Sequence, residues 1–271
     1  MQRTNRTSRA VPVPRRGTMP GISEMQLATY RFHGDLLHLL RRRWQTANPV
    51  VQPVTRAASI KDVFESFGVP HTEVGAIACN GNPIDFSWPV GAGQHFDILP
   101  IPVPWDPTLP TLLRPTPLPG PAAFLVDITV GRLARYLRSA GFDTLYEPSW
   151  KDRDMLRTLA LEPRLLLSRN RDLLKRKQVV FGRLIRAGKP PEQLREVLDL
   201  LGITSPARPF SRCLECNALL QPVAKADILH RLEPLTIRYF DIFQICRVCD
   251  KIYWPGSHVD RMRQTLIGGK G

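Results

Sequence analysis

The chain has 271 residues, which is enough for two or three domains that each bury a core. Hydrophobic residues make up 43% of it, and no window approaches 18 consecutive apolar residues, which argues against a membrane span. Lys and Arg outnumber Asp and Glu by 38 to 24, and this excess favours a polyanionic partner such as nucleic acid, although a proteome rich in Arg would give the same composition.

The N-terminal residues 1–23 carry five Arg and no acid, and they contain no apolar stretch long enough for a secretory signal. We expect a disordered basic tail here and a cytoplasmic protein. The other concentration of positive charge is residues 122–208, with 17 basic and 10 acidic residues. Residues 24–100 are nearly balanced, with six basic and seven acidic residues.

Residues 24–100 are predicted to form a small mixed sheet crossed by one helix. Alternating apolar residues indicate the strands, and Ser59 and Gly68 are placed to begin and end the helix. The expected elements are strands at 25–34 and 50–58, a helix at 59–68, a strand with an Asn-Gly turn at 74–85 and a last strand at 95–101. This order is typical of a ubiquitin-like β-grasp domain.

A β-grasp domain can act as a sulfur carrier or modifier when it ends in Gly-Gly. Here the pair Gly268–Gly269 lies at the chain terminus, after a different domain. We therefore interpret residues 24–100 as a docking module for a protein partner. Cys79 lies in an apolar strand and is predicted to be a buried structural thiol rather than a nucleophile.

A proline-rich segment follows the β-grasp domain. Residues 100–121 hold nine prolines in 22 positions, a density that prevents helices and sheet ladders. In the polyproline II conformation, at about 3.1 Å per residue, the segment would reach roughly 70 Å. We expect residues 101–121 to be a semi-rigid linker that separates two folded units.

Residues 122–208 alternate strand and helix, which predicts a largely parallel α/β sheet covered by helices. The expected strands are 122–128, 144–146, 164–168 and 178–186, and the expected helices are 129–143, 151–162, 171–177 and 190–203. Ligands bind such sheets at the carboxyl ends of the strands. The site should therefore lie at that edge.

Acidic residues follow the strand ends or open the next helix. Asp127 ends the first buried strand, and its carboxylate must face the sheet edge or be neutralised. Carboxylates gathered there would suit Mg²⁺ or Mn²⁺ and phosphodiester cleavage. Helix capping and surface ion pairs are the alternatives for the other members. The candidate catalytic residues are Asp127, Asp152, Asp154, Asn170 and Asp172.

Basic residues are placed to hold phosphates beside these acids. Three of them recur at a spacing of three on the first helix, and five more flank the acids after the third strand. A solvated helix face is the alternative for each one. The candidate nucleic-acid-binding residues are Arg132, Arg135, Arg138, Arg169, Arg171, Lys175, Arg176 and Lys177.

Residues 209–271 contain two Cys-x-x-Cys pairs, Cys213 with Cys216 and Cys246 with Cys249. Two knuckles of this spacing place four thiolates for tetrahedral Zn²⁺, so we predict a structural zinc ribbon with an added helix between the pairs. Because four Cys already close the site, His230 and His258 are interpreted as surface residues.

These motifs resemble a known family. Residues from about 123 to 263 resemble the Mut-seven C-terminal RNase domain, a PIN-like nuclease fused to a zinc ribbon, and the matching stretches include "FLVDITVGRLARYLRSAGFDTLY", "LLLSRNRDLLKRK" and "FSRCLECNALLQPV". Residues 24–100 resemble the ubiquitin-like module that often precedes it. The resemblance implies a multidomain chain with a β-grasp domain, then a PIN-like parallel sheet, then a zinc ribbon.

The resemblance also implies metal-dependent RNA cleavage, with Asp127 and Asp152 matching acidic positions of PIN-like domains. Related domains commonly show Thr-x-Asp-x-Asp after the third strand, whereas this chain has Ser168, Asn170 and Asp172 at those positions. An amide oxygen can coordinate a metal but adds no charge. Two hypotheses follow: an Mg²⁺- or Mn²⁺-dependent ribonuclease, or a non-catalytic RNA-binding or adaptor protein.

Overall fold

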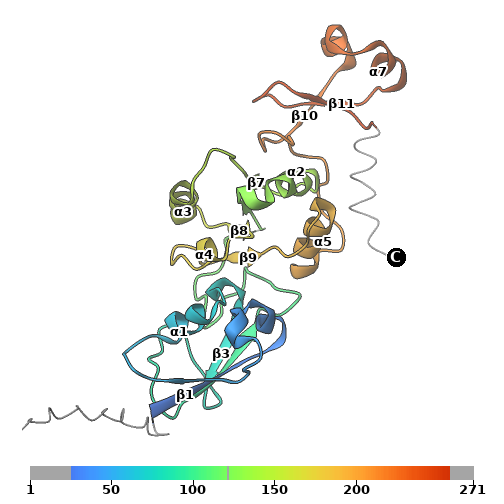
Figure 1. The fold of residues 1–271 in the computed structure, drawn as a ribbon. Coiled ribbons are helices and arrows are strands. Elements are labelled where there is room, and N and C mark those ends of the chain that lie inside the picture. The colour runs from blue at the N-terminus through green and yellow to red at the C-terminus, as the bar shows by residue number, and fades with distance from the viewer. Residues whose placement is uncertain (1–25, 121, 257–271) are drawn as a thin grey trace, which may run out of the picture.

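The computed structural model describes residues 26–120 and 122–256, and three domains follow one another along an elongated molecule (Figure 1). The predictions for residues 1–23, His258 and Gly268–Gly269 lie outside these residues. Within the described part of the chain, no helix has the length and apolar character needed to cross a membrane.

The N-terminal domain is a five-stranded mixed sheet crossed by one helix, as predicted for a β-grasp fold. Its strand order is β2-β1-β5-β3-β4, with β1 and β5 parallel and the other pairs antiparallel. The elements are β1 (Leu27–Phe32), β2 (Val50–Pro53), α1 (Ile60–Phe67), β3 (Val74–Cys79), β4 (Asn82–Pro83) and β5 (His95–Pro100), with 3₁₀ turns η2 (Gly34–Leu39), η3 (Arg42–Trp44) and η4 (His71–Glu73).

Local sequence accounts for the helix of this domain. The Ser59 side chain accepts a hydrogen bond from the Asp62 backbone N–H at 3.2 Å, and Gly68 ends the helix with φ of 115°. The apolar face packs on the sheet, where the Phe67 ring lies 5.3 Å from that of Tyr30. Cys79 is buried on β3, as predicted.

The second domain is a four-stranded parallel sheet with the order β7-β6-β8-β9. Its elements are β6 (Phe124–Val126), η5 (Ile128–Val130), α2 (Gly131–Ser139), β7 (Thr144–Leu145), α3 (Asp152–Leu161), β8 (Leu165–Ser168), α4 (Arg171–Leu174), β9 (Gly182–Leu184) and α5 (Pro190–Leu200). The elements follow the predicted order. Strand β9 is shorter than predicted because the chain before it is still turning, with the Val179 N–H bonded to the Arg176 carbonyl at 2.9 Å.

The proline-rich segment differs from the predicted spacer. Trp105, Leu113 and Leu118 are buried, and the Trp105 N–H donates to the Leu200 carbonyl at 2.7 Å. Arg114 is also buried and donates to carbonyls of both domains, Val74 at 2.9 Å and Val180 at 3.2 Å. Proline density prevents regular hydrogen-bond ladders, but the apolar residues between the prolines still gain free energy by burial. The segment therefore packs along both domains instead of separating them.

The β-grasp domain and the parallel-sheet domain share one buried cluster. Leu125 and Leu166, on one face of the parallel sheet, belong to the same cluster as Phe64 and Phe67 of the β-grasp core. Glu73 lies in this boundary with 0% of its side chain exposed, and its Oε1 accepts the Leu184 N–H at 2.8 Å. The two domains therefore form a continuous body.

The C-terminal domain is an antiparallel ribbon with the strand order β10-β11-β12. Its elements are β10 (Gln221–Val223), α6 (Lys225–Ile228), η6 (Leu229–Arg231), α7 (Pro234–Tyr239), β11 (Phe243–Ile245) and β12 (Ile252–Tyr253). The helical insertion between the cysteine pairs and the hairpin that carries the second pair are as predicted. His230 is exposed in η6. The domain is consistent with a zinc ribbon.

Candidate active site and metal centre

Asp127 lies at the carboxyl end of β6, and only 3% of it is exposed. Its Oδ2 accepts hydrogen bonds from the Thr129 Oγ1 and the Ser168 Oγ, both at 2.6 Å. The Ser168 hydroxyl oxygen also accepts the Asn170 N–H at 2.9 Å, which ties the end of β8 to the same network. The two hydroxyls fix the orientation of the carboxylate, and Oδ1 takes part in neither bond.

A hollow of about 330 Å³ is lined by Ile128, which follows Asp127, and by Arg169, which follows Ser168. The hollow therefore lies beside Asp127 and Ser168. Its walls include Gly131 and Arg132 in the first turn of α2, where the backbone N–H groups carry partial positive charge, and Pro190 at the start of α5, which has no N–H. Two predicted phosphate-binding residues, Arg132 and Arg169, line it as well. The hollow therefore combines the N-terminus of α2 with two arginines, an arrangement that favours an anion.

The absence of a side chain at Gly131 shapes this hollow. A Cβ at this position would collide with the hydroxyl end of Tyr146, whose side chain also lines the hollow. Glycine at the first position of α2 therefore allows the Tyr146 ring to lie against the helix N-terminus.

The other predicted acids lie in the first turns of helices α3 and α4. Asp152 is exposed at the first position of α3, and Asp154 accepts the Lys151 N–H at 3.1 Å as part of the helix cap. Asp172 is 89% exposed, with Lys175 3.8 Å away. In residues 26–120 and 122–256, none of these acids belongs to a group of three or more His, Cys, Asp or Glu side chains close enough to share a metal ion. The predicted convergence of three carboxylates is therefore not formed.

Asn170 caps helix α4 instead of facing a metal. Its Oδ1 accepts the N–H groups of Asp172 at 3.0 Å and Leu173 at 3.2 Å. An amide oxygen has two lone pairs, and these two bonds use both. The structure thus differs from the expectation that this oxygen assists a metal, because the short helix needs a cap at that position.

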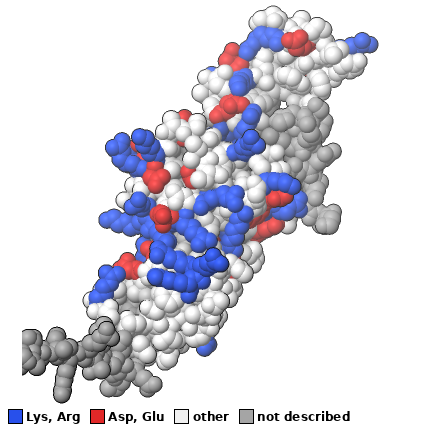
Figure 2. Space-filling view, in the orientation of Figure 1, with Lys and Arg blue, Asp and Glu red and all other residues white. Residues whose placement is uncertain are grey.

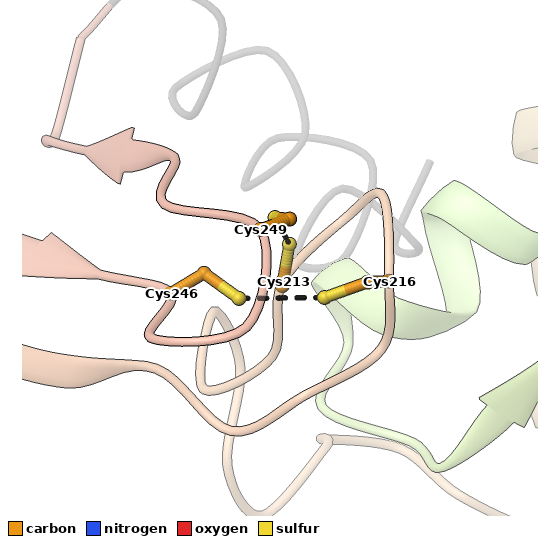
Figure 3. A group of neighbouring side chains, drawn as sticks. All are labelled: Cys213, Cys216, Cys246 and Cys249. Atoms are coloured by element: carbon orange, nitrogen blue, oxygen red, sulfur yellow. Dashed lines mark hydrogen bonds between the residues drawn. The ribbon is translucent and has the colours of Figure 1, made fainter.

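Within the described residues, four cysteines form the one group of His, Cys, Asp or Glu side chains that lie close enough together to share a metal ion (Figure 3). All four sulfur atoms lie within 4.8 Å of one another, with Cys213 and Cys249 3.4 Å apart and Cys216 and Cys246 3.3 Å apart. Each Cys-x-x-Cys knuckle supplies two of the four sulfurs. The residue that follows each knuckle has positive φ, 71° at Asn217 and 59° at Asp250. The predicted tetrad is therefore assembled and could hold a metal ion.

The surroundings of Cys213 favour its thiolate. Burial raises the pKa of this thiol, but the backbone N–H of Cys216, the Tyr253 hydroxyl and the backbone N–H of Glu215 outweigh burial and lower the pKa to about 6. The Tyr253 Oη lies 3.1 Å from the Cys213 sulfur and also accepts the Leu214 N–H at 3.2 Å. A thiolate is the form that binds metal, so these donors orient and stabilise a ligand.

Two family models match this chain. The model described as Mut7-C RNAse domain matches residues 122–266, more than half of the chain. The chain belongs to the Mut7-C RNase family. A second model, Mut7-C ubiquitin, matches residues 25–106 of this Mut7-C protein. No curated protein and no solved structure gives a significant match.

Two of the predicted nucleic-acid-binding residues of the Mut7-C protein have structural partners instead. Arg138 is only 3% exposed, and its guanidinium donates to the carbonyls of Thr144, Leu214 and Glu215. Arg171 donates to the Leu39 carbonyl of the β-grasp domain at 2.9 Å. The three-residue spacing of the arginines on α2 does not reveal the structural role of Arg138, because the helix directs this last arginine toward the ribbon.

The remaining predicted basic residues stay near the surface. Arg132, Arg169, Arg176 and Lys177 are exposed, whereas Lys175 is partly buried. Arg135 is 53% exposed and forms an ion pair with Glu215 at 2.8 Å.

Three site features of the Mut7-C domain were missed from the sequence. They are the hydroxyls of Thr129 and Ser168 on Asp127, and the contact between Gly131 and Tyr146. A hydroxyl residue two positions after a strand-end Asp is a usable signal, since such side chains commonly bond back to that carboxylate. Nothing in the sequence around Tyr146 points to its position in the hollow.

Proposed function

We propose that this Mut7-C protein is a ribonuclease that cleaves single-stranded RNA at the carboxyl edge of its parallel sheet, with the help of Mg²⁺ or Mn²⁺. The single observation that carries the proposal is the oriented, buried carboxylate of Asp127 beside the arginine-lined hollow. A buried carboxylate costs free energy and is retained where it is paired or binds a cation. The membership of the family supports the choice of reaction.

Asp127 is the residue that would hold the catalytic ion. Mg²⁺ usually keeps several waters and binds through one or two carboxylates together with substrate phosphates, so one oriented carboxylate at an open edge fits its needs. When bound, the ion would activate water and neutralise charge on the phosphate. Asp152 and Asp172 remain predicted second ligands, and both are exposed. Asp154 and Asn170 act in helix capping in our proposal.

The hollow would hold a phosphate of the RNA. Arg132 and Arg169 can donate to its oxygens in the forked geometry that guanidinium groups share with phosphates. The N–H groups at the start of α2 add partial positive charge on the same side. Thr129 lines the hollow and also donates to Asp127, so a phosphate there would lie next to the carboxylate.

Zn²⁺ is the ion we propose for the four cysteines. A Zn–S distance of about 2.3 Å in a tetrahedron corresponds to sulfurs about 3.8 Å apart. The observed sulfur separations of 3.3 Å and 3.4 Å, with all four within 4.8 Å, agree with such a site. Four thiolates leave no open position for a substrate, so the role is structural.

The second candidate is a non-catalytic RNA-binding or adaptor protein. The observation that favours it is the spread of the acids, because Asn170 is used as a cap and the exposed Asp172 lies against Lys175. In that case the hollow and the basic surface would bind RNA, and Asp127 would only fix the loop through Thr129 and Ser168.

The deciding experiment compares wild type with Asp127→Asn on labelled single-stranded RNA in Mn²⁺. Loss of a metal-holding carboxylate removes several kcal/mol of stabilisation, or about 10²-fold or more in rate. Asp199→Asn is the matched control, because Asp199 is exposed near the end of α5. We expect the control to cut normally and Asp127→Asn to bind RNA without cutting it. Equal activity of wild type and Asp127→Asn would overturn the nuclease proposal.

A further inference from the structure

Three consecutive arginines, Arg41, Arg42 and Arg43, lie at the η3 turn of the β-grasp domain. All three are exposed, and within the described residues none forms an ion pair with a carboxylate. The Arg43 guanidinium stacks over the Trp44 ring at 4.9 Å, and Trp44 packs on Phe67 of the core with ring centroids 5.5 Å apart. The turn is therefore anchored by its aromatic residue and presents its cations to solvent.

The chain just before this turn contacts helix α4 of the RNase domain. Arg171, the first residue of α4, donates to the Leu39 carbonyl at 2.9 Å, and Leu39 precedes Arg41 by two residues. Arg171 in turn follows Arg169, which lines the hollow, by two residues. The chain segments that carry the cations of the hollow, of α4 and of η3 thus follow one another across the domain boundary.

The surface charge agrees with this path. In Figure 2, Lys and Arg side chains gather over the middle of the molecule, where the β-grasp domain meets the parallel-sheet domain. The acids at the boundary are engaged: Asp35 pairs with Arg186 at 2.5 Å, and Glu73 with Arg183 at 3.1 Å and Arg186 at 3.2 Å. The positive potential of the path is therefore not cancelled by a neighbouring acidic cluster.

The domain boundary fixes the turn relative to the hollow. The buried Glu73, the shared apolar cluster and Arg114 all join the two domains. A surface held in place before binding loses less conformational entropy when it binds a long ligand. The fixed position of the β-grasp domain argues against its being a freely tethered module that only recruits a protein.

We propose that Arg41, Arg42 and Arg43 make the β-grasp domain part of the RNA-binding surface, gripping the backbone of single-stranded RNA that extends from the hollow across α4. The inference rests on the proposed function for the choice of RNA, but it does not require cleavage. Its physical consequence is a dependence on length: an RNA that fills only the hollow cannot reach the turn, whereas a longer one gains contacts there.

The test uses the full chain in the Asp127→Asn background, so that RNA is bound but not cut. Binding of single-stranded RNAs of about 4 and about 20 nucleotides is measured against salt concentration. The test variant is Arg41→Ala with Arg42→Ala, which leaves the stacked Arg43 in place. The matched control is Arg31→Ala with Arg56→Ala, which removes the same charge from exposed positions on β1 and after β2. A Lys substitution of Arg41 and Arg42 keeps the charge.

We expect the test variant to bind the long RNA about tenfold more weakly, with a salt slope reduced by about 1.4, since each lost phosphate contact on a single strand accounts for about 0.7. Binding of the short RNA should be unchanged, the control should match the parent, and the Lys variant should retain the affinity. If the test variant binds the long RNA as the control does, the inference fails and the β-grasp domain is left as a docking module for protein. If wild type binds and cuts no RNA, the proposed function fails.

Discussion

Replacing Arg138 by Leu should loosen the junction between helix α2 and the ribbon. The guanidinium donates to the carbonyls of Thr144 at 3.0 Å, Leu214 at 3.0 Å and Glu215 at 2.7 Å. Hydrogen bonds from a charged donor contribute roughly 1.5–3 kcal/mol each, but burial, which lowers the pKa of Arg138, offsets part of that sum. We expect a net loss of about 3 kcal/mol from the free energy that holds the first knuckle on the RNase domain.

The matched control for this prediction is Arg135→Leu on the same helix. Arg135 is 53% exposed, and among residues 26–120 and 122–256 its one ion pair is with Glu215, so the control should cost less than about 1 kcal/mol. Hydrogen exchange of residues 213–217 and the rate of zinc release to a chelator report the local stability, and RNA affinity is measured in parallel. The reasoning is refuted if Arg138→Leu exchanges and releases zinc at the wild-type rate, or if its main effect is weaker RNA binding.

Three further predictions concern stability. Gly141→Ala should lower the free energy of unfolding by at least about 2 kcal/mol in thermal unfolding, because φ there is 90° and the new Cβ would collide with the Arg208 carbonyl. The control Gly188→Ala should change the stability little, because the space around Gly188 is open. Metal analysis should find one zinc per chain, and Cys216→Ser should lose it; a folded ribbon without zinc would contradict the structural role. Burial raises the pKa of Asp143, but hydrogen bonds from Arg164 and Asn217 outweigh burial and lower it. Its folded pKa therefore lies below the unfolded value of about 3.9, so its contribution to stability is present above about pH 4 and lost as pH falls through the folded pKa. Urea unfolding of Asp143→Asn should lack this part of the acid sensitivity, and an unchanged pH profile would argue against it.

The positions of helices and strands were predictable because their causes are local. Ser59 and Gly68 mark both ends of α1 through bonds and dihedral angles within one turn of the chain. The apolar run of β8 must be buried on both faces, and this places it inside a parallel sheet. The four cysteines were identified by spacing alone, since each knuckle is a short turn that brings two thiols together.

The prediction failed where a side chain has its partner in a distant segment. Arg138 looks like part of a basic stripe on α2, yet its carbonyl partners Leu214 and Glu215 lie more than seventy residues away in the chain. The prolines of residues 101–121 suggest an extended spacer. Trp105 and Arg114, which lie among these prolines, nevertheless form hydrogen bonds with the neighbouring domains. Such partners depend on how the domains pack, which no local pattern encodes.

The sequence by itself determined the β-grasp, parallel-sheet and ribbon domains, the cysteine tetrad, and Asp127 at the carboxyl edge of the sheet. Periodicity, caps and ligand spacing carry that information, because each depends on residues within a few turns of one another. Only the tertiary structure decided that Asp127 is held by Thr129 and Ser168, that Asn170 is used as a cap, and that the end of η2 in the β-grasp domain contacts α4. Those outcomes depend on burial and on hydrogen bonds between segments that meet only when the whole chain has folded.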